Sequence, residues 1–201
     1  MWYNKAREVV ALYTLFIDTH DKNVLLILFK NGKVLDKIDI ETVNKHSVVA
    51  TPSIKTILDS NNCDVHSLNE IIVCNGPGSF TGSRIAVTIA KTISYSLKIP
   101  IKQIDALTIM SINVDSDKKI VALKDRNGAY VGKYDKDNKL LEDMVYLNNK
   151  EYNELCEAND VIENIDVDYE KMYSYLDSIE HINVHEVKPI YIKGISALND
   201  K

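Results

Sequence analysis

The sequence predicts an α/β fold in which parallel strands are joined by helices. Short apolar runs of strand length alternate with longer runs of helical spacing over residues 12–104. The run Ile71–Cys74 is continuously apolar, as in a strand that is buried on both faces. The chain has 201 residues, 45% of them hydrophobic, which is enough to bury the core of one domain or of two small ones.

The chain is expected to open with three antiparallel strands over residues 12–18, 23–30 and 33–41. Asn31-Gly32 separates the last two strands, and this pair strongly favours a two-residue hairpin turn. Residues 21–23 supply the earlier turn. These patterns therefore predict a three-stranded meander at the start of the fold.

Two helices and two further strands follow in the first half. A helix is predicted over residues 44–61, and Pro52 is expected to kink it or divide it, because proline lacks the backbone donor that a helix uses. After the strand at 71–74, residues 81–97 place apolar side chains on one face at helical spacing. A short strand near 99–104 completes the order β-β-β-α-β-α-β, which indicates a layered α/β fold.

The second half has weaker patterns. They predict helices over 105–112 and 149–158, strands over 118–125, 128–135 and 139–147, a buried strand over 160–165, and an extended segment from 181. The predicted organisation is an N-terminal extension (1–11), an N-terminal lobe (12–104) and a C-terminal lobe (105–201), because the pattern restarts near residue 105.

Composition and charge exclude several classes of protein. The net charge of −5 argues against a chain that grips nucleic acid by itself, which would show a basic surface. Three cysteines without zinc spacing are typical of reduced thiols in a cytoplasmic protein, and Cys74 is expected to be a core residue. No segment has the ~18 apolar residues that a membrane span needs.

The glycine-rich stretch 75–84, "NGPGSFTGSR", differs from the known phosphate-binding loops. It lacks the spacing and the lysine of a phosphate-binding P-loop, and it is one residue too long for the dinucleotide fingerprint. It also lacks the glycines that flank a hydrolase nucleophile at Ser79. What remains is a strand-to-helix turn that Ser79 or Thr81 caps, with an anion site at the helix start as the alternative.

Other candidate chemistry is limited. Residues 18–21, "DTHD", could help to hold a metal–nucleotide complex, although a hairpin turn explains them more simply. His181 and His185 have half the spacing of a zinc site, but their surroundings predict an extended segment. We therefore expect no catalytic residue and no metal ligand in this chain.

The stretch 75–100 resembles the signature of the TsaB (YeaZ) family, which carries a G-P-G-S-F-T-G-x-R pattern followed by a helix. The matching residues are Gly76, Pro77, Gly78, Ser79, Phe80, Thr81, Gly82, Arg84, Ile85, Ala90, Lys91, Ile99 and Pro100. The resemblance is specific there, fair over residues 12–60 and faint beyond 104. The chain departs from the family at His20, which replaces a small hydroxyl residue, at Ser83, which replaces a leucine, and at Ala86 and Ala129.

The resemblance implies an actin-like ATPase (ASKHA) fold with two β-β-β-α-β-α lobes. It further implies a non-catalytic subunit that pairs with a larger homologue, TsaD, and works with the ATPase TsaE to add a threonylcarbamoyl group to the adenosine beside the tRNA anticodon. Under this resemblance the chain binds no cofactor itself, ATP and metal belong to the partner subunits, and tRNA is reached only through the complex.

The resemblance also implies that the two helices of the first lobe contact the larger subunit. The residues assigned to this interface are His46, Val49, Arg84, Thr88, Lys91, Thr92 and Tyr95. Two alternatives stay open: a stand-alone ATP-binding enzyme of the same fold, and a module that forms homodimers through the same helices.

Overall fold

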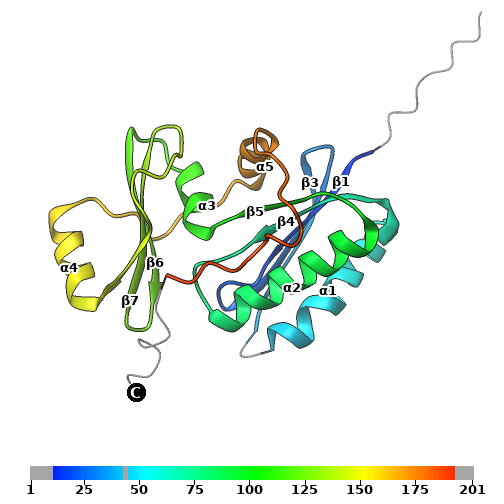
Figure 1. The fold of residues 1–201 in the computed structure, drawn as a ribbon, viewed down its shortest axis with the longest axis horizontal. Coiled ribbons are helices and arrows are strands. Elements are labelled where there is room, and N and C mark those ends of the chain that lie inside the picture. Colours follow the sequence, from blue (N-terminus) through cyan, green and yellow to red (C-terminus); the bar gives the residue numbers. More distant parts are fainter. Residues whose placement is uncertain (1–10, 43–44, 193–201) are drawn as a thin grey trace, which may run out of the picture.

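The computed structural model describes residues 11–42 and 45–192, which form two β-sheets with helices around them (Figure 1). The predicted extension over residues 1–11 lies, apart from Ala11, outside the described residues. The mixed α/β fold predicted from the sequence is confirmed.

The first sheet has five strands in the order β3-β2-β1-β4-β5. The first three form the predicted antiparallel meander, and β4 and β5 add to β1 as parallel strands. The bounds are β1 (Tyr13–Asp18), β2 (Asn23–Lys30), β3 (Lys33–Glu41), β4 (Leu68–Cys74) and β5 (Ile101–Ile104). Because β1 and β4 are parallel neighbours, their carboxyl ends meet at the same edge of the sheet.

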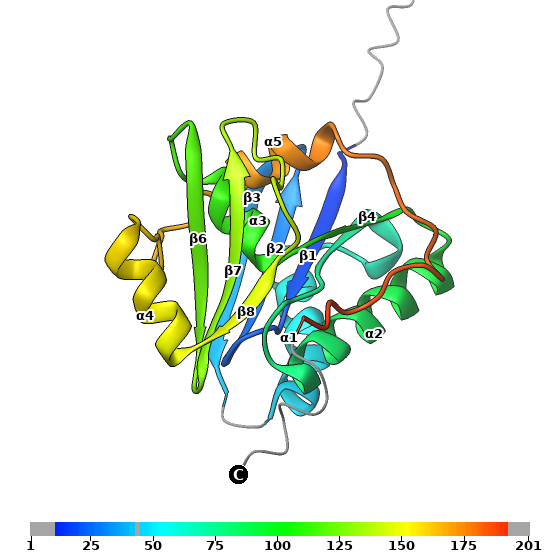
Figure 2. The ribbon, with the colours of Figure 1, turned by 60° about the vertical axis from the view of Figure 1, so that its left-hand side comes forward.

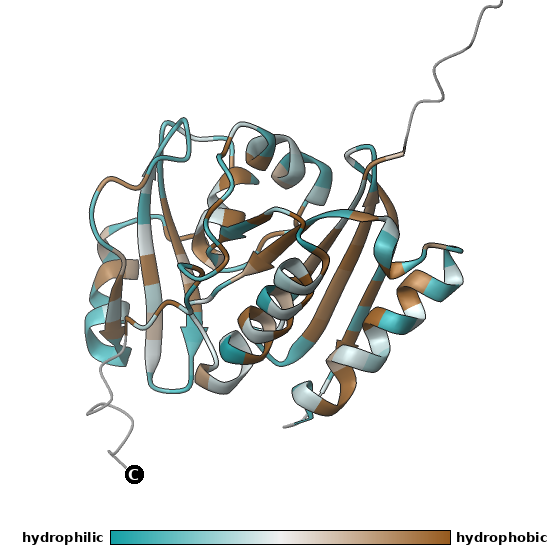
Figure 3. Cartoon of the chain, turned by 45° about the vertical axis from the view of Figure 1, so that its right-hand side comes forward, coloured by the Kyte–Doolittle hydropathy of each residue, from teal (hydrophilic) through white to brown (hydrophobic). Residues whose placement is uncertain are grey.

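Two long helices, α1 (His46–Ser60) and α2 (Phe80–Leu97), cover one face of this sheet (Figure 1). A 3₁₀ turn (Val65–Ser67) leads into β4. In Figure 3 the strands carry long hydrophobic stretches, whereas the helices alternate hydrophobic and hydrophilic bands. The order β-β-β-α-β-α-β predicted for the first half is confirmed.

The expectation that Pro52 divides this helix is wrong, since α1 is a single helix across Pro52, while a kink there stays a prediction. The proline lies on the exposed side, so its missing N–H frees the carbonyl of Val48 near solvent. Val48 is itself 69% exposed, and water can therefore take the place of the lost hydrogen bond.

The opposite face of the first sheet is covered by α3 (Ala106–Ile112) and α5 (Tyr169–Asp177). Met172 and Leu176 of α5 are buried in one cluster with Phe16 and Phe29 of the sheet. The sequence patterns do not predict α5. Its contacts with residues more than 130 positions earlier, such as the 2.7 Å ion pair between Lys33 Nζ and Glu170 Oε2, help to position it.

The second sheet has the order β6-β7-β8 and is antiparallel. Its strands are β6 (Lys118–Asp125), β7 (Gly128–Asp135) and β8 (Val145–Asn148), and α4 (Asn149–Ala158) packs on its outer face (Figure 2). The helix α3 lies between the sheets: its Leu107 and Met110 pack on the second, and its Ile109 and Ile112 on the first.

The predicted buried strand over residues 160–165 is wrong. Only Ile162 pairs, in an isolated parallel bridge to Val121. Its N–H donates to the carbonyl of Ile120, and its carbonyl accepts from the N–H of Ala122. This one residue therefore pairs with two backbone groups of β6 before the chain turns away. A short apolar run is ambiguous in this way because its pairing depends on which sheet edge is free.

The segment that follows α5 returns to the first sheet. Ile182 pairs with Ile101 of β5, and Val187 is buried among the residues that lie between the sheet and α1 and α2. The N–H of Ile190 donates to the carbonyl of Asn75, just after β4. Residues from beyond position 105 therefore complete the core around the first sheet, while the proposed lobe boundary near 105 stays a prediction.

Candidate functional site

The glycine loop 75–79 connects β4 to α2, and hydrogen bonds within the chain fix its conformation. Ser79 is the N-cap of α2, and its Oγ accepts a hydrogen bond of 3.1 Å from the N–H of Gly82. The N–H of Ser79 donates to the carbonyl of His20 at 2.6 Å, and the N–H of Ser83 donates to the carbonyl of Ser79 at 2.9 Å. The N–H groups of Ser79 and Gly82, two donors that a phosphate-binding loop would present to a ligand, are thus used inside the chain, while the bond from Ser83 is the first bond within the helix.

Two glycines of the loop are required by the close approach of the β1–β2 turn. A Cβ on Gly82 would lie 2.0 Å from the carbonyl oxygen of Thr19, and one on Gly78 would lie 2.3 Å from that of His20. Gly78 also has a φ of +154°, which side chains disfavour. The Thr19 hydroxyl donates to the carbonyl of Gly82 at 2.6 Å and accepts from the N–H of Ala86 at 3.1 Å. The signature glycines therefore fit α2 against the end of β1.

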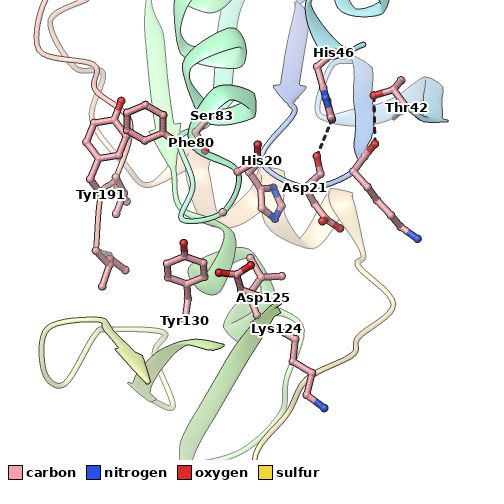
Figure 4. Close-up of a pocket in the computed structure, with 16 residues that line it drawn as sticks. His20, Asp21, Thr42, His46, Phe80, Ser83, Lys124, Asp125, Tyr130 and Tyr191 are labelled. Carbon is pink, nitrogen blue, oxygen red and sulfur yellow. Dashed lines mark hydrogen bonds between the residues drawn. The ribbon is translucent and has the colours of Figure 1, made fainter. Parts of the chain in front are cut away.

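A cleft of about 460 Å³ lies between the two sheets, beside this loop (Figure 4). Its walls come from the β1–β2 turn, the start of α2, the end of β6 and the segment 190–192. Among the residues labelled in Figure 4, Asp125 and Tyr130 come from the second sheet and point toward the group around His20, whereas the Lys124 side chain points away from it. The volume of this cleft lies in the range of small-ligand sites.

One wall of the cleft carries a stack of aromatic and cationic groups. The guanidinium carbon of Arg84 lies 3.9 Å from the centroid of the Phe80 ring, and its Nε donates to the hydroxyl of Tyr191 at 2.7 Å. The Phe80 and Tyr191 rings are 5.0 Å apart. Arg84, one of the predicted interface residues, is therefore engaged at the rim of the cleft.

A cluster of three ionisable side chains lies at the edge where β1 and β4 end. His20 Nδ1 is 2.7 Å from Asp18 Oδ1 and 3.6 Å from Cys74 Sγ. Burial lowers the pKa of His20, but the charge of Asp18 and its hydrogen bond outweigh burial, so this pKa lies well above its ordinary value. Burial raises the pKa of the Cys74 thiol to about 11, which disfavours a free nucleophilic thiolate.

A second cavity of about 680 Å³ forms a groove between α1 and α2 on the outer side of the first sheet. Its floor is mainly apolar, and Ile54, Leu58, Val65, Ile89 and Ile93 contribute to it. Ile89 and Ile93 are half-buried, and Val65 is 37% exposed. We call this feature the α1/α2 groove.

The structure brings only two of the predicted interface residues, Thr88 and Thr92, to the α1/α2 groove. Lys91 instead donates to the carbonyls of His185 and Val187, and the ring of Tyr95 lies 5.6 Å from that of His185.

The two predicted interface residues on α1 lie in its first turn. His46 lines the cleft, where its Nε2 is 2.8 Å from the carbonyl oxygen of Asp21, and Val49 packs against the core. The seven residues are therefore spread over the groove, the rim of the cleft, the core and the strip beside residues 185–187.

His181 and His185, which share half the spacing of a zinc site, have different partners. His181 Nε2 lies 2.7 Å from Glu70 Oε1, whereas the His185 ring contacts Tyr95. The pair therefore does not converge on one point.

Comparison with known proteins places the chain in a family. The family model described as TsaD, tRNA N6-adenosine threonylcarbamoyltransferase, matches residues 40–157, more than half of the chain. The TsaB protein of Bacillus subtilis, named for tRNA threonylcarbamoyladenosine biosynthesis, is 37% identical over 136 residues. The chain belongs to this family, in its TsaB (YeaZ) branch.

The extent of the matches differs between relatives. The alignment with the B. subtilis TsaB protein covers 65% of this chain and 58% of that protein. The MG208 protein of Mycoplasma genitalium is 29% identical over 92% of this chain and 96% of its own length. YeaZ from Pseudomonas aeruginosa, a solved structure, superposes with a TM-score of 0.73 at 17% identity, covering 90% of this chain and 99% of that one. This likeness shows that the chain has the fold of YeaZ.

Two features of the site were missed from the sequence. Cys74 was assigned to the core, and its approach to His20 follows only once β1 and β4 are known to be parallel neighbours. The signal was present, because both residues lie at or just after the end of a strand. The groove depends on the spacing of α1 and α2, which no local pattern encodes.

In the described part of the chain, no helix is long and apolar enough to cross a membrane.

Proposed function

We propose that this chain is a non-catalytic partner subunit in the biosynthesis of threonylcarbamoyladenosine in tRNA. It binds a larger homologous subunit of the TsaD type, works with an ATPase of the TsaE type, and reaches tRNA only through that complex. Family membership and the names of the TsaB relatives support the pathway. The net charge of −5 supports the assignment of tRNA binding to another subunit.

The observation that carries the partner role is the α1/α2 groove. Ile89, Ile93 and Val65 of its floor stay partly exposed in the single chain, and the covering of such apolar side chains is what stabilises protein association. A homologous subunit has an equivalent helix pair, so its helices can lie along the groove as helices pack ridge into groove. Lys55, Asp59 and Asp64 at the rim add charges that can select the partner.

The internal use of the loop donors supports a scaffold role. The N–H of Ser79 donates to the His20 carbonyl and the N–H of Gly82 to Ser79 Oγ, so the loop is committed to joining β4, α2 and the β1–β2 turn. These bonds are suited to fixing the start of α2, one of the two helices of the groove, against the end of β1.

Binding of the larger subunit can be tested with a single substitution in the groove. Ile89→Asp places a charge on the apolar floor, and we expect affinity for the purified TsaD-type subunit to fall by more than about thirtyfold, as at an interface hot spot. Leu141→Asp is the matched control: Leu141 is 55% exposed and precedes β8, far along the chain from the groove. Calorimetric affinities that are equal for both variants and the parent would refute the assignment of the groove.

The pathway is tested in cells. Depletion of this protein is expected to lower threonylcarbamoyladenosine in tRNA, measured by mass spectrometry of digested nucleosides, and the parent gene but not the Ile89→Asp variant should restore it. Normal levels after depletion would refute the role.

The cleft between the sheets favours one alternative, a stand-alone enzyme that binds a nucleotide. Titration of the purified chain with ATP and magnesium separates the two functions, because stoichiometric binding by the chain alone would favour the enzyme. Sedimentation at several concentrations, with and without the larger subunit, distinguishes a homodimer from the proposed heterodimer.

A further inference from the structure

The cluster of Asp18, His20 and Cys74 brings together one oxygen, one nitrogen and one sulfur donor. All three ligand atoms lie within 4.8 Å of one another. Asp18 ends β1, His20 follows in the turn, and Cys74 ends the neighbouring parallel strand β4. Two adjacent strands of the sheet therefore supply the donors from a single edge.

The distances fit a small metal ion. In a tetrahedral zinc site, bond lengths of about 2.0 to 2.3 Å place a sulfur and a nitrogen ligand about 3.6 Å apart and nitrogen and oxygen ligands about 3.3 Å apart. The observed Sγ–Nδ1 distance is 3.6 Å and the Nδ1–Oδ1 distance is 2.7 Å. A small rotation of the carboxylate or of the ring, which opens the second distance by about 0.6 Å, would bring both into range.

A catalytic triad does not explain the arrangement. In a triad the nucleophile and the acid contact opposite nitrogens of the histidine, whereas here Asp18 and Cys74 both approach Nδ1. Cys74 is also fully buried, out of reach of a substrate. Two donors that approach the same nitrogen of an imidazole, and so place three ligand atoms around one point, are instead compatible with a metal site.

A backbone group orients one of the donors. The N–H of His20 donates to Asp18 Oδ1 at 2.9 Å. The carbonyl of His20 accepts from the N–H of Ser79, which ties the turn to the glycine loop. Such supporting hydrogen bonds fix ligand orientation before the metal arrives.

His20 also connects the cluster to solvent. It lines the cleft of about 460 Å³, and its side chain is 15% exposed, against 8% for Asp18. A metal held by the three donors would therefore be reached from the cleft, with its remaining coordination position on that side. Thiolate, imidazole and carboxylate together suit zinc and similar transition metals, whereas magnesium and calcium prefer oxygen alone.

We propose that Asp18, His20 and Cys74 form a binding site for one divalent transition-metal ion of the zinc class, with an open position toward the cleft. This site departs from the expectation that the chain binds no metal. It does not depend on the proposed partner role, since binding is measured on the isolated chain.

The test is a titration of the metal-free full chain with cobalt(II), followed by competition with zinc. We expect one equivalent to bind, with a thiolate-to-cobalt charge-transfer band and the intense visible bands of tetrahedral cobalt, and zinc should displace it. Cys74→Ser should abolish the charge-transfer band. His20→Ser, which installs the small hydroxyl type usual in the TsaB family, should fold normally and bind more than about tenfold more weakly.

Matched controls come from the same chain. His46→Ser alters another histidine of the cleft, His181→Ser removes the histidine paired with Glu70, and Cys63→Ser alters another buried cysteine. All three should retain the cobalt spectrum and the affinity. Binding that survives in His20→Ser, binding lost in a folded control, or a parent chain that takes up no cobalt would each overturn the proposal.

Discussion

Replacement of Gly82 by alanine tests how tightly α2 is fitted against the end of β1. Inside an ordinary helix this change stabilises by about 1 kcal/mol, because alanine has the higher helix propensity. Here the new Cβ would lie 2.0 Å from the Thr19 carbonyl oxygen, a backbone atom, whereas real Cβ atoms essentially never come closer than 3.0 Å. The helix would therefore have to move by about 1 Å.

The size of the effect follows from what that movement disrupts. Overpacking costs about 1 to 3 kcal/mol. Loss of the two hydrogen bonds of the Thr19 hydroxyl, to the carbonyl of Gly82 and from the N–H of Ala86, adds about 1 to 3 kcal/mol. After the gain in helix propensity is subtracted, we expect Gly82→Ala to lower the free energy of unfolding by about 3 kcal/mol.

Urea unfolding followed by circular dichroism measures this change. Thr81→Ala, an exposed neighbour in the same turn, is the control and should stay within about 0.5 kcal/mol of the parent. Thr19→Val removes the hydroxyl without adding a Cβ, so it isolates the contribution of the two hydrogen bonds. A Gly82→Ala protein as stable as the parent would refute the packing argument.

Three further predictions concern buried polar groups. Ser83→Ala should raise the free energy of unfolding by about 1 kcal/mol, because the buried Ser83 hydroxyl has no hydrogen-bond partner among the described residues; destabilisation in urea would contradict this. Burial raises the pKa of Asp105 despite its hydrogen bonds to Thr108, so the folded protein holds this proton more tightly than the unfolded chain. The free energy of unfolding therefore falls as the pH rises through the folded pKa. Asp105→Asn keeps an acceptor for the helix cap, and its stability relative to the parent should increase from about pH 3 to about pH 7 in paired urea titrations; a constant difference would argue against the shift. Iodoacetamide should label half-buried Cys156 before fully buried Cys74, as peptide mass spectrometry can record, and equal rates would contradict the burial of Cys74.

The first half of the fold was predictable because its signals are local. The strands β6 and β7 were also predicted with their observed bounds, since the turn at residues 126–127 separates two clear apolar runs. The helix α5 was not predictable in this way. Its tyrosine-rich sequence has modest helix propensity, and its position depends on distant contacts such as the packing of the Tyr173 ring 4.9 Å from that of Phe29.

The same distinction between local signals and long-range contacts applies to the candidate site. The glycine loop was predicted as a strand-to-helix turn, and Ser79 does cap the helix. The proximity of His20 and Cys74, which are 54 positions apart, required the parallel pairing of β1 and β4. Likewise, Lys91 and Tyr95 were placed on a partner-facing side, but the return of residues 182–190 to the first sheet gives them neighbours that local patterns do not reveal.

That return has a consequence for the order in which the chain is made. The last strand of the first sheet ends at Ile104, but α5, which covers part of its second face, ends only at Asp177. At ordinary rates of protein synthesis, the 73 residues between these positions take roughly 4 to 15 seconds to emerge. During that interval Phe16 and Phe29 lack their covering helix and expose apolar surface. We therefore expect the nascent chain to be prone to aggregation until α5 has been made.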